Sequence, residues 1–183
     1  MNSRPQRLGK YQIRSVLGRG AMGVVYKAFD PDIRRTIAIK TFGRAASAGD
    51  SREQLFTGRF RTEAQAAGKL MHPGIVQVYE YGEQPDFAYI AMEFVEGSSL
   101  REYMTHDASF SEHDMVSLMV QLLDALAHAH ANGVWHRDIK PANLLIASDG
   151  RLKIADFGIS RHEHSELTQV GVIMGTPGYM PPE

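Results

Sequence analysis

The sequence contains no cysteine among its 183 residues, so disulfide bridges and thiolate chemistry play no part in its stability or function. The absence of cysteine fits a reducing compartment, and we expect a cytoplasmic location. An excess of charge of one sign is missing as well, because the formal net charge is only -1. No overall field attracts the chain to nucleic acid or to anionic lipid, and we expect no nucleic-acid partner.

Long apolar runs are also absent. The most apolar region, residues 115–131, is interrupted by Gln121, Asp124, His128 and His130, so no segment is expected to span a membrane. The first residues, MNSRPQRLGKYQI, carry basic side chains without an apolar stretch after them, which argues against a secretory signal. The chain does have 43% hydrophobic and 22% charged residues, an ordinary composition for one globular domain or two small lobes.

The first half of the chain is predicted to form mainly β-structure. Short segments in it alternate between apolar and polar residues, or are rich in β-branched and aromatic ones. The five predicted strands cover residues 11–17, 23–29, 35–42, 75–81 and 87–95. Residues 52–70 have helical spacing that puts the carboxylate of Glu63 on the inward side. We therefore predict a five-stranded sheet with one main helix.

The second half of the chain is predicted to be mainly helical. A short helix is expected near residues 99–104 and a longer one over residues 112–132. Ser111 is a suitable N-cap for the longer helix, and Gly133 is a suitable stop at its C-terminal end. The stripe of Leu and Met residues along this helix is expected to belong to the core. The fold class is therefore α+β.

A glycine-rich stretch, LGRGAMGVVYKA, places Gly18, Gly20 and Gly23 between the first two predicted strands. Glycines let a backbone approach phosphates closely and present N–H donors to them. Alone, this spacing is a weak signal, because a glycine-rich hairpin turn has the same pattern. The dinucleotide-binding version should open a helix, whereas VVYKAF continues as a strand, which disfavours a dinucleotide-dependent oxidoreductase.

Further polar residues stand out from their surroundings. Lys40 lies on the third predicted strand, in TIAIK, where a lysine is usually solvated. The segment VWHRDIKPANLLI, residues 134–146, sets five polar side chains between apolar residues, and such groups are costly to bury without partners. In IADFGIS, Asp156 lies between a strand-like LKIA and a Phe-Gly turn.

Taken together and in this order, these motifs make the chain resemble the protein kinase family. The glycine loop lies between strands, Lys40 is on the third strand, His-Arg-Asp-x-Lys-x-x-Asn matches residues 136–143, and Asp-Phe-Gly matches residues 156–158. GTPGYMPPE resembles the end of a kinase activation segment, and GAMGVVYKA looks most like bacterial serine/threonine kinases related to eukaryotic ones. The resemblance implies a protein-kinase-like bilobal fold, with a nucleotide-binding lobe at 1–95 and a partial second lobe at 96–183.

The same resemblance implies phosphoryl transfer from ATP, with Mg²⁺, to Ser or Thr hydroxyls of protein substrates in signalling. Asp138 would accept or orient the proton of the attacking hydroxyl. Lys140 would stabilise the transferring phosphoryl group, and a lysine here is typical of serine/threonine kinases. Lys40 would reach the α- and β-phosphates, with the carboxylate of Glu63 as its partner.

Metal ligands and a nucleotide site also follow from the resemblance. Asp156 would hold Mg²⁺ at the phosphates and Asn143 would hold a second Mg²⁺, because hard cations prefer oxygen ligands. The loop from Gly18 to Gly23 would cover the triphosphate. The residues expected around adenine are Leu17, Val25, Ala38, Met92 and Leu145, with the backbone of Glu93 and Val95 bonding the base edge.

Regulation by phosphorylation is a further expectation from the family. Arg137 directly precedes the catalytic aspartate, an arrangement that goes with a phosphorylated activation loop. We expect Thr168 to be the main regulatory site, and Thr176 to bond near the catalytic loop. His136 is expected to be structural, packing near Phe157 and bonding to backbone.

Two functions stay open at this point. Kinases normally continue with several helices beyond the position of Glu183, so a truncated or pseudokinase-like module that binds ATP without transfer is the alternative to an active kinase. Pseudokinases usually lose the lysine or one of the two catalytic aspartates. Lys40, Asp138 and Asp156 are all present, which favours phosphoryl transfer for the complete domain.

Overall fold

The computed structural model describes residues 5–20, 23–43, 61–62, 64–85, 87–106, 109–157 and 177–179. The chain divides into two compact units, and each is described by itself. The first unit contains Met1–Ala64 and Val78–Phe94, and the second contains Gln65–Gln77 and Val95–Glu183. Residues 65–77, which the sequence placed with the first lobe, therefore pack with the second unit.

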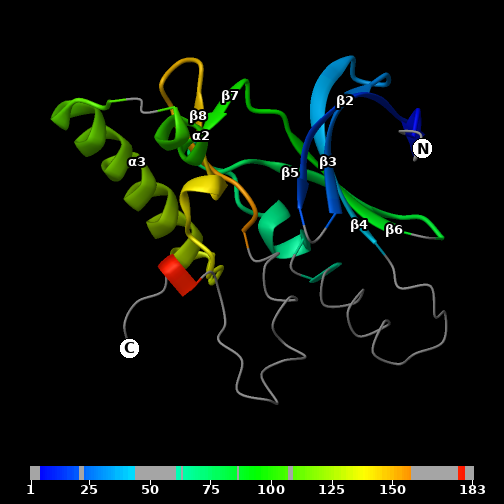
Figure 1. Cartoon of the computed structure of the whole chain (residues 1–183). Helices are drawn as coiled ribbons and strands as arrows, with labels where there is room; N and C mark the ends of the chain where they lie inside the picture. The colour runs from blue at the N-terminus through cyan, green and yellow to red at the C-terminus, as the bar shows by residue number, and fades with distance from the viewer. Residues whose placement is uncertain are drawn as a thin grey trace. The chain divides into compact units, whose positions relative to one another are not determined.

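The first unit contains a six-stranded antiparallel sheet in the order β1-β2-β3-β4-β6-β5 (Figure 1). The strands are β1 Arg7–Leu8, β2 Tyr11–Gly20, β3 Gly23–Asp30, β4 Arg35–Gly43, β5 Val78–Glu83 and β6 Phe87–Glu93. All five predicted strands have a counterpart, and β1 is an additional short strand. The start predicted for the fourth strand is wrong, because the chain enters this sheet at Val78 rather than at residue 75.

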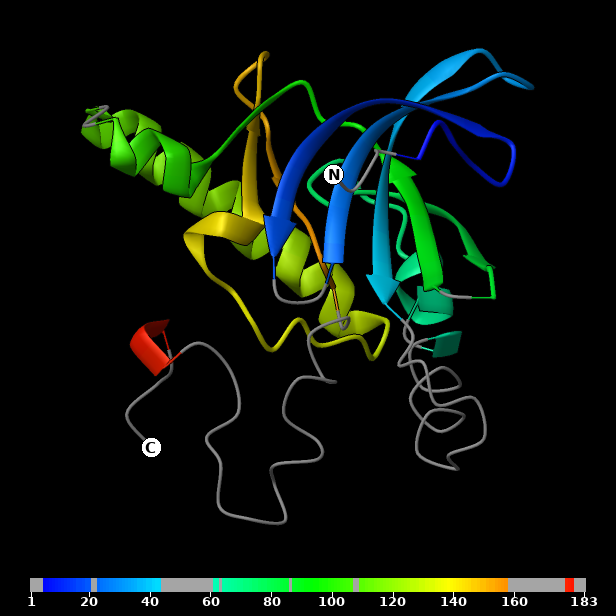
Figure 2. The same ribbon diagram turned by 45° about the vertical axis from the view of Figure 1, so that its right-hand side comes forward.

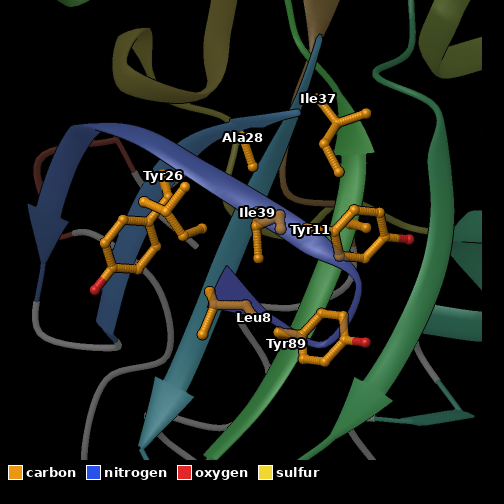
Figure 3. Close-up of a cluster of buried hydrophobic side chains, with 9 residues drawn as sticks. Leu8, Tyr11, Tyr26, Ala28, Ile37, Ile39 and Tyr89 are labelled. Atoms are coloured by element: carbon orange, nitrogen blue, oxygen red, sulfur yellow. The ribbon is translucent and has the colours of Figure 1, made fainter. Parts of the chain in front are cut away.

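One face of this sheet carries the core of the first unit (Figure 3). Successive residues of a strand point to opposite faces, so Ile37 and Ile39 of β4 face this core while Ala38 and Lys40 face away from it. The buried cluster consists of Leu8, Tyr11, Ile13, Tyr26, Ala28, Ile37, Ile39, Tyr89 and Ala91. Each large aliphatic side chain buried here contributes about 1.5–3 kcal/mol relative to exposure.

Two tyrosine hydroxyls at this core donate to one carboxylate. Tyr11 of β2 donates to Glu80 Oε2 at 2.5 Å, and Tyr89 of β6 donates to Glu80 Oε1 at 3.1 Å. Figure 3 shows both hydroxyls directed to the same side. Glu80 lies on β5, which three strands separate from β2 in the sheet order, so the sheet curls to let this bridge form. Burial is the main cause that raises the pKa of both hydroxyls, that of Tyr89 to about 12.

The predicted helix at residues 52–70 lies only partly within the described ranges. Residues 61–62 and 64–68 are helical, and Ala67 is buried, as the apolar spacing predicts. Glu63 lies outside the described residues, so its predicted inward position stays a prediction.

Both helices predicted for the second half are confirmed to within one residue: α2 is Leu100–Thr105 and α3 is Glu112–Ala131. The hydroxyl of Ser111 accepts from the backbone N–H of Asp114 at 3.1 Å, and the carboxylate of Asp114 accepts from the backbone N–H of Ser111 at 3.1 Å. This reciprocal capping box satisfies backbone donors that a helix start leaves open. Gly133 has φ 72°, a left-handed conformation that suits glycine just beyond a helix end.

The Leu and Met stripe along α3 is half-buried at Leu118, Leu122 and Leu126 and exposed elsewhere, so the prediction that it belongs to the core is wrong for most of its length. Only the small residues Ala125 and Ala129 of this helix are buried. The exposed side chains, each with 53% to 61% of its surface accessible, are Met115, Val116, Met119, Val120 and Leu123. Helical spacing determines which residues share a face, but it does not determine what covers that face. Within the described ranges, no helix is long and apolar enough to cross a membrane.

The second unit also contains a sheet, in the part of the chain predicted to be mainly helical. Its strands pair in the antiparallel order β7-β8-β9, and β9 packs against α3 (Figure 2). The elements are β7 Gly97–Ser99, β8 Leu144–Ala147 and β9 Leu152–Ile154, with short 3-10 helices η1 at Pro141–Asn143 and η4 at Pro177–Tyr179. Ile75 forms an isolated parallel bridge with Ile154, which explains why residue 75 does not begin β5.

Candidate functional site

In the first unit, Lys40 lies on the sheet face opposite the core cluster. Its partners across the ladder are Val25 of β3 and Ile90 of β6, and Ala38 pairs with Met92 in the same way. Residues directly opposite in an antiparallel pair project to the same face. The sheet therefore brings the side chains of Lys40, Val25, Ala38 and Met92 onto one face.

The three glycines of the predicted phosphate loop differ in their surroundings. Gly23 has φ 141°, and a Cβ there would lie 1.9 Å from the carbonyl oxygen of Thr41, so close backbone approach requires glycine. At Gly18 and Gly20 an added Cβ would meet nothing within 4 Å. Packing among the described residues does not account for these two glycines. Leu17, beside them, lies at a β2 irregularity and has 48% of its surface exposed.

In the second unit, the imidazole of His136 connects two stretches of backbone. Its Nε2 lies 2.8 Å from the carbonyl oxygen of Ala155, and its Nδ1 accepts from the backbone N–H of Asp138 at 3.2 Å. These partners assign the neutral tautomer with the proton on Nε2. Burial lowers the pKa of His136, which keeps the ring neutral. The ring packs edge-on against Phe157 at 4.8 Å, so the predicted structural role of His136 is confirmed.

The carboxylate of Asp138 meets two side chains of the same loop. Lys140 Nζ lies 2.7 Å from Asp138 Oδ2, and Asn143 Nδ2 donates to this oxygen at 3.2 Å and to the Asp138 carbonyl at 2.9 Å. The side chain of Asp138 is 11% exposed and that of Lys140 is 28% exposed. A hydrogen bond from a charged donor is shorter and stronger than one between neutral groups. The structure therefore gathers three of the residues predicted to take part in catalysis.

Backbone bonding brings Asp156 next to this loop. The N–H of Ala155 donates to the carbonyl oxygen of Asn143 at 2.9 Å. Asp156 follows with φ 62°, and Arg137 has φ 66°. A non-glycine residue in this region costs on the order of 1–3 kcal/mol, and such residues cluster at functional sites.

Asn143 and Asp156 fit the ligand habits of Mg²⁺. Because the amide nitrogen of Asn143 is directed at Asp138, its Oδ1 points away from that residue. Asp156, which follows the residue whose N–H bonds the Asn143 carbonyl, has a carboxylate side chain. In the part of the chain that the structure describes, no group of three His, Cys, Asp or Glu residues could hold a metal ion. Mg²⁺ usually takes one or two protein ligands and completes its shell with water and phosphate oxygens.

The remaining predicted site residues are distributed over both units or lie outside the described ranges. Glu93 is in the first unit, whereas Val95 and Leu145 are in the second. Arg137 is exposed beside the catalytic loop. The residues outside the described ranges are Glu63, Thr168 and Thr176.

Sequence reasoning missed one contact close to this site. His72 Nε2 lies 3.1 Å from Asp124 Oδ2, although the two residues are 52 positions apart in the chain. In the sequence, His72 was only part of a helix stop and Asp124 only an interruption of an apolar region. No local pattern relates them.

A strand lysine, a glycine hairpin, and a loop that groups Asp, Lys and Asn are parts found in enzymes that act on phosphate groups. Residues 11–183 match the family described as Protein kinase domain, so the chain belongs to the protein kinase family. The predicted protein-kinase-like α+β fold is therefore confirmed.

Named relatives are serine/threonine kinases. The chain is 43% identical to Serine/threonine-protein kinase PrkC of Bacillus subtilis over 176 residues, covering 96% of this chain and 26% of that protein. It is 36% identical to Serine/threonine-protein kinase PknB of Mycobacterium leprae, covering 100% of this chain and 30% of that protein. It is 39% identical to Serine/threonine-protein kinase cds1 of Schizosaccharomyces pombe, covering 94% of this chain and 38% of that protein. The chain thus spans less than half the length of each.

Proposed function

We propose that this chain is the nucleotide-binding and catalytic part of a protein serine/threonine kinase that transfers the γ-phosphoryl group of ATP to Ser or Thr hydroxyls. The observation that supports it most is the group formed by Asp138, Lys140 and Asn143, with Asp156 next to it through a backbone bond. Phosphoryl transfer depends mainly on positioning and charge stabilisation, and this group offers both.

Asp138 is the residue that would handle the proton in this mechanism. Its Oδ2 would accept or orient the proton of the attacking hydroxyl. Lys140 Nζ, 2.7 Å from that oxygen, would stabilise the charge of the transferring phosphoryl group. Asn143 fixes the carboxylate through its donated bonds, so the acceptor oxygen is oriented before substrate arrives.

The nucleotide would be held by residues from the predicted set. Lys40 would pair with the α- and β-phosphates, with Glu63 as its partner, and the backbone at Gly18 and Gly20 would approach the phosphates where no side chain intervenes. The proposed adenine site consists of Leu17, Val25, Ala38, Met92 and Leu145, with backbone groups of Glu93 and Val95.

Asn143 and Asp156 would hold Mg²⁺ through their side-chain oxygens. Held by these two residues, the metal would neutralise negative charge on the phosphates. The backbone bond from Ala155 to Asn143 keeps the two ligand residues adjacent, and their oxygens are the donor type that this cation prefers.

The proposal also covers regulation by phosphorylation, the protein substrates and the cellular location. Arg137, exposed beside the catalytic loop, would pair with a phosphate on Thr168, and Thr176 would bond near the catalytic loop. Protein substrates containing Ser or Thr are the proposed partners. We place the activity in the cytoplasm, where ATP is available.

Replacing Asp138 by Asn tests the proposal. The variant keeps the size of the side chain but removes the proton acceptor, so transfer from radiolabelled ATP to a Ser/Thr protein substrate should fall by about 10²–10⁴-fold. The shift of melting temperature on adding ATP and Mg²⁺ should persist. Asp149→Asn, at an exposed aspartate of the β8–β9 turn, is the matched control and should keep full activity. A wild-type chain that shows the thermal shift but transfers nothing would favour the non-catalytic ATP-binding module instead.

A further inference from the structure

The strand that leads to Asp156 is β9, and its backbone forms hydrogen bonds with α3 and with the segment 72–76. The N–H of Leu152 donates to Gln121 Oε1 of α3 at 2.9 Å. The N–H of Ile154 donates to the carbonyl oxygen of Gly74 at 2.8 Å, and the N–H of Val76 donates to the carbonyl oxygen of Ile154 at 2.9 Å. The segment 72–76 thus forms a two-bond bridge to the residue two positions before Asp156.

The same segment is fixed on α3 by the ring of His72. His72 Nδ1 accepts from the N–H of Gly74 at 3.0 Å, so the proton is on Nε2, which lies 3.1 Å from Asp124 Oδ2. The ring also packs at 5.0 Å from that of His128 on the next turn of the helix. The side chain of His72 is only 14% exposed. One ring therefore contacts both α3 and the segment that bonds β9.

Close packing leaves little freedom at this junction. A Cβ on Gly74 would lie 3.0 Å from the Cβ of Ala125 on α3. Backbone and helix already approach to the limit here, and the bonds of His72 act at the same junction. Gly74 is the residue that both accepts from Ile154 and donates to His72.

We propose that His72 and Asp124 are positioning residues for Asp156: their bond orients the segment 72–76, which sets β9 and hence the carboxylate at its end. The inference rests on the proposed function in one respect, that Asp156 is a ligand of Mg²⁺. A partly exposed pair of this kind contributes little to global stability. Its effect is expected in the geometry of the strand and in metal-dependent nucleotide binding.

The first measurement is amide hydrogen exchange at Val76 and Ile154 in the full 183-residue chain. In His72→Ala and Asp124→Ala, exchange at both amides should be about five- to tenfold faster, because the bridge opens locally more often. Asp124→Asn keeps an oxygen that accepts from His72 Nε2 and should stay within about twofold of wild type. His113→Ala, at an exposed histidine in the first turn of α3, is the matched control and should change neither amide.

The second measurement is ATP affinity by calorimetry, with Mg²⁺ and with a chelator. In the two alanine variants the dissociation constant for ATP should rise about three- to tenfold with Mg²⁺ and stay unchanged without it. An equal loss under both conditions, or unchanged exchange at the two amides, overturns the positioning role. A wild-type chain whose ATP affinity ignores Mg²⁺ overturns the proposed function and the role of Asp156 with it, whereas the exchange rates still report on the bridge separately.

Discussion

Two polar sites, one in each unit, are held by different kinds of hydrogen bond. In the first, the hydroxyls of Tyr11 and Tyr89 bond the carboxylate of Glu80, so side chain meets side chain across a curled sheet. In the second, His136 bonds the backbone at Asp138 and Ala155. Backbone pairing between strands already holds the first unit together, and the two hydrogen bonds to Glu80 add to it. The segment 134–140 has no strand ladder of its own, so the backbone bonds of His136 are added to the side-chain contacts that Lys140 and Asn143 make with Asp138.

The largest difference between the two units is expected when a glycine in each is replaced by alanine and the free energy of unfolding is compared. A Cβ at Gly82 would lie 2.2 Å from the ring of Tyr89, whereas a Cβ at Gly97 would lie 2.0 Å from the carbonyl oxygen of Ile146. A ring can shift, but a paired strand backbone cannot. We expect Gly97→Ala to lower the free energy of unfolding by about 3 kcal/mol and Gly82→Ala by about 1–2 kcal/mol.

Denaturant unfolding of both variants measures this difference. Trp135 is the single tryptophan of the chain and lies in the second unit, so its fluorescence follows the unit that contains Gly97. Circular dichroism follows the secondary structure of both units, so a transition that it shows apart from the Trp135 signal belongs to the first unit. If Gly82→Ala lowers the free energy of unfolding as much as Gly97→Ala does, then a clash with a side chain is no better tolerated than a clash with paired backbone.

Alkaline pH should act on the first unit. Tyr11 and Tyr89 have raised pKa values, that of Tyr89 about 12, so the fold favours their neutral forms. Their contribution is complete below the ordinary tyrosine value near pH 10 and is lost as the pH rises from about 10 towards 12. Each such tyrosine lowers the unfolding free energy by up to about 1.4 kcal/mol per pH unit in this window.

Tyr89→Phe isolates one of these two contributions. The variant should lose about 1 kcal/mol at pH 8, because one hydrogen bond to Glu80 is gone, and its alkaline slope should be shallower than that of wild type. Urea unfolding between pH 8 and pH 11, followed by circular dichroism, gives both numbers. An identical slope in wild type and variant would show that Tyr89 does not titrate with folding.

Acid should act on the second unit, with a smaller effect. The pKa of His136 is lowered by burial, so the unfolded chain binds this proton more readily than the folded chain. Stability is complete above the ordinary histidine value near pH 6.5 and falls as the pH drops below it. His136→Gln should be less stable than wild type at pH 7.5 but should depend less on pH between about 6.5 and 5.

A matched exposed histidine separates this effect from general titration. His113→Gln should keep the pH dependence of wild type, because His113 is exposed at the start of α3. Unfolding followed by the fluorescence of Trp135 reports on the relevant unit. Equal pH dependence in His136→Gln and wild type would contradict the proposed difference between the two units.

Local signals predicted much of the fold. The alternation in β4 and the cap of α3 at Ser111 depend on residues close together in sequence, and both are confirmed. The strand start predicted at residue 75 is wrong because Ile75 pairs with Ile154, a partner that local alternation cannot indicate. The same limit applies to the sheet β7-β8-β9, whose first strand pairs with a segment far along the chain.

The candidate site was predictable as a set of residue types but not as a set of contacts. The motif spacing indicated Asp138, Lys140 and Asn143, and the structure places them within bonding distance. The contact between His72 and Asp124 had no local signal, because each residue has an ordinary alternative explanation in its own segment. Burial and long-range pairing, which decide such contacts, are properties of the folded chain.

The left-handed backbone at Asp156 has a consequence for how this position can change. Aspartate and asparagine are among the few non-glycine residues that adopt this conformation readily. An exchange between them alters the charge and leaves the loop with the same shape. Position 156 can therefore lose its chemistry without losing its fold, a route by which an inactive descendant of such a chain could arise in a single step.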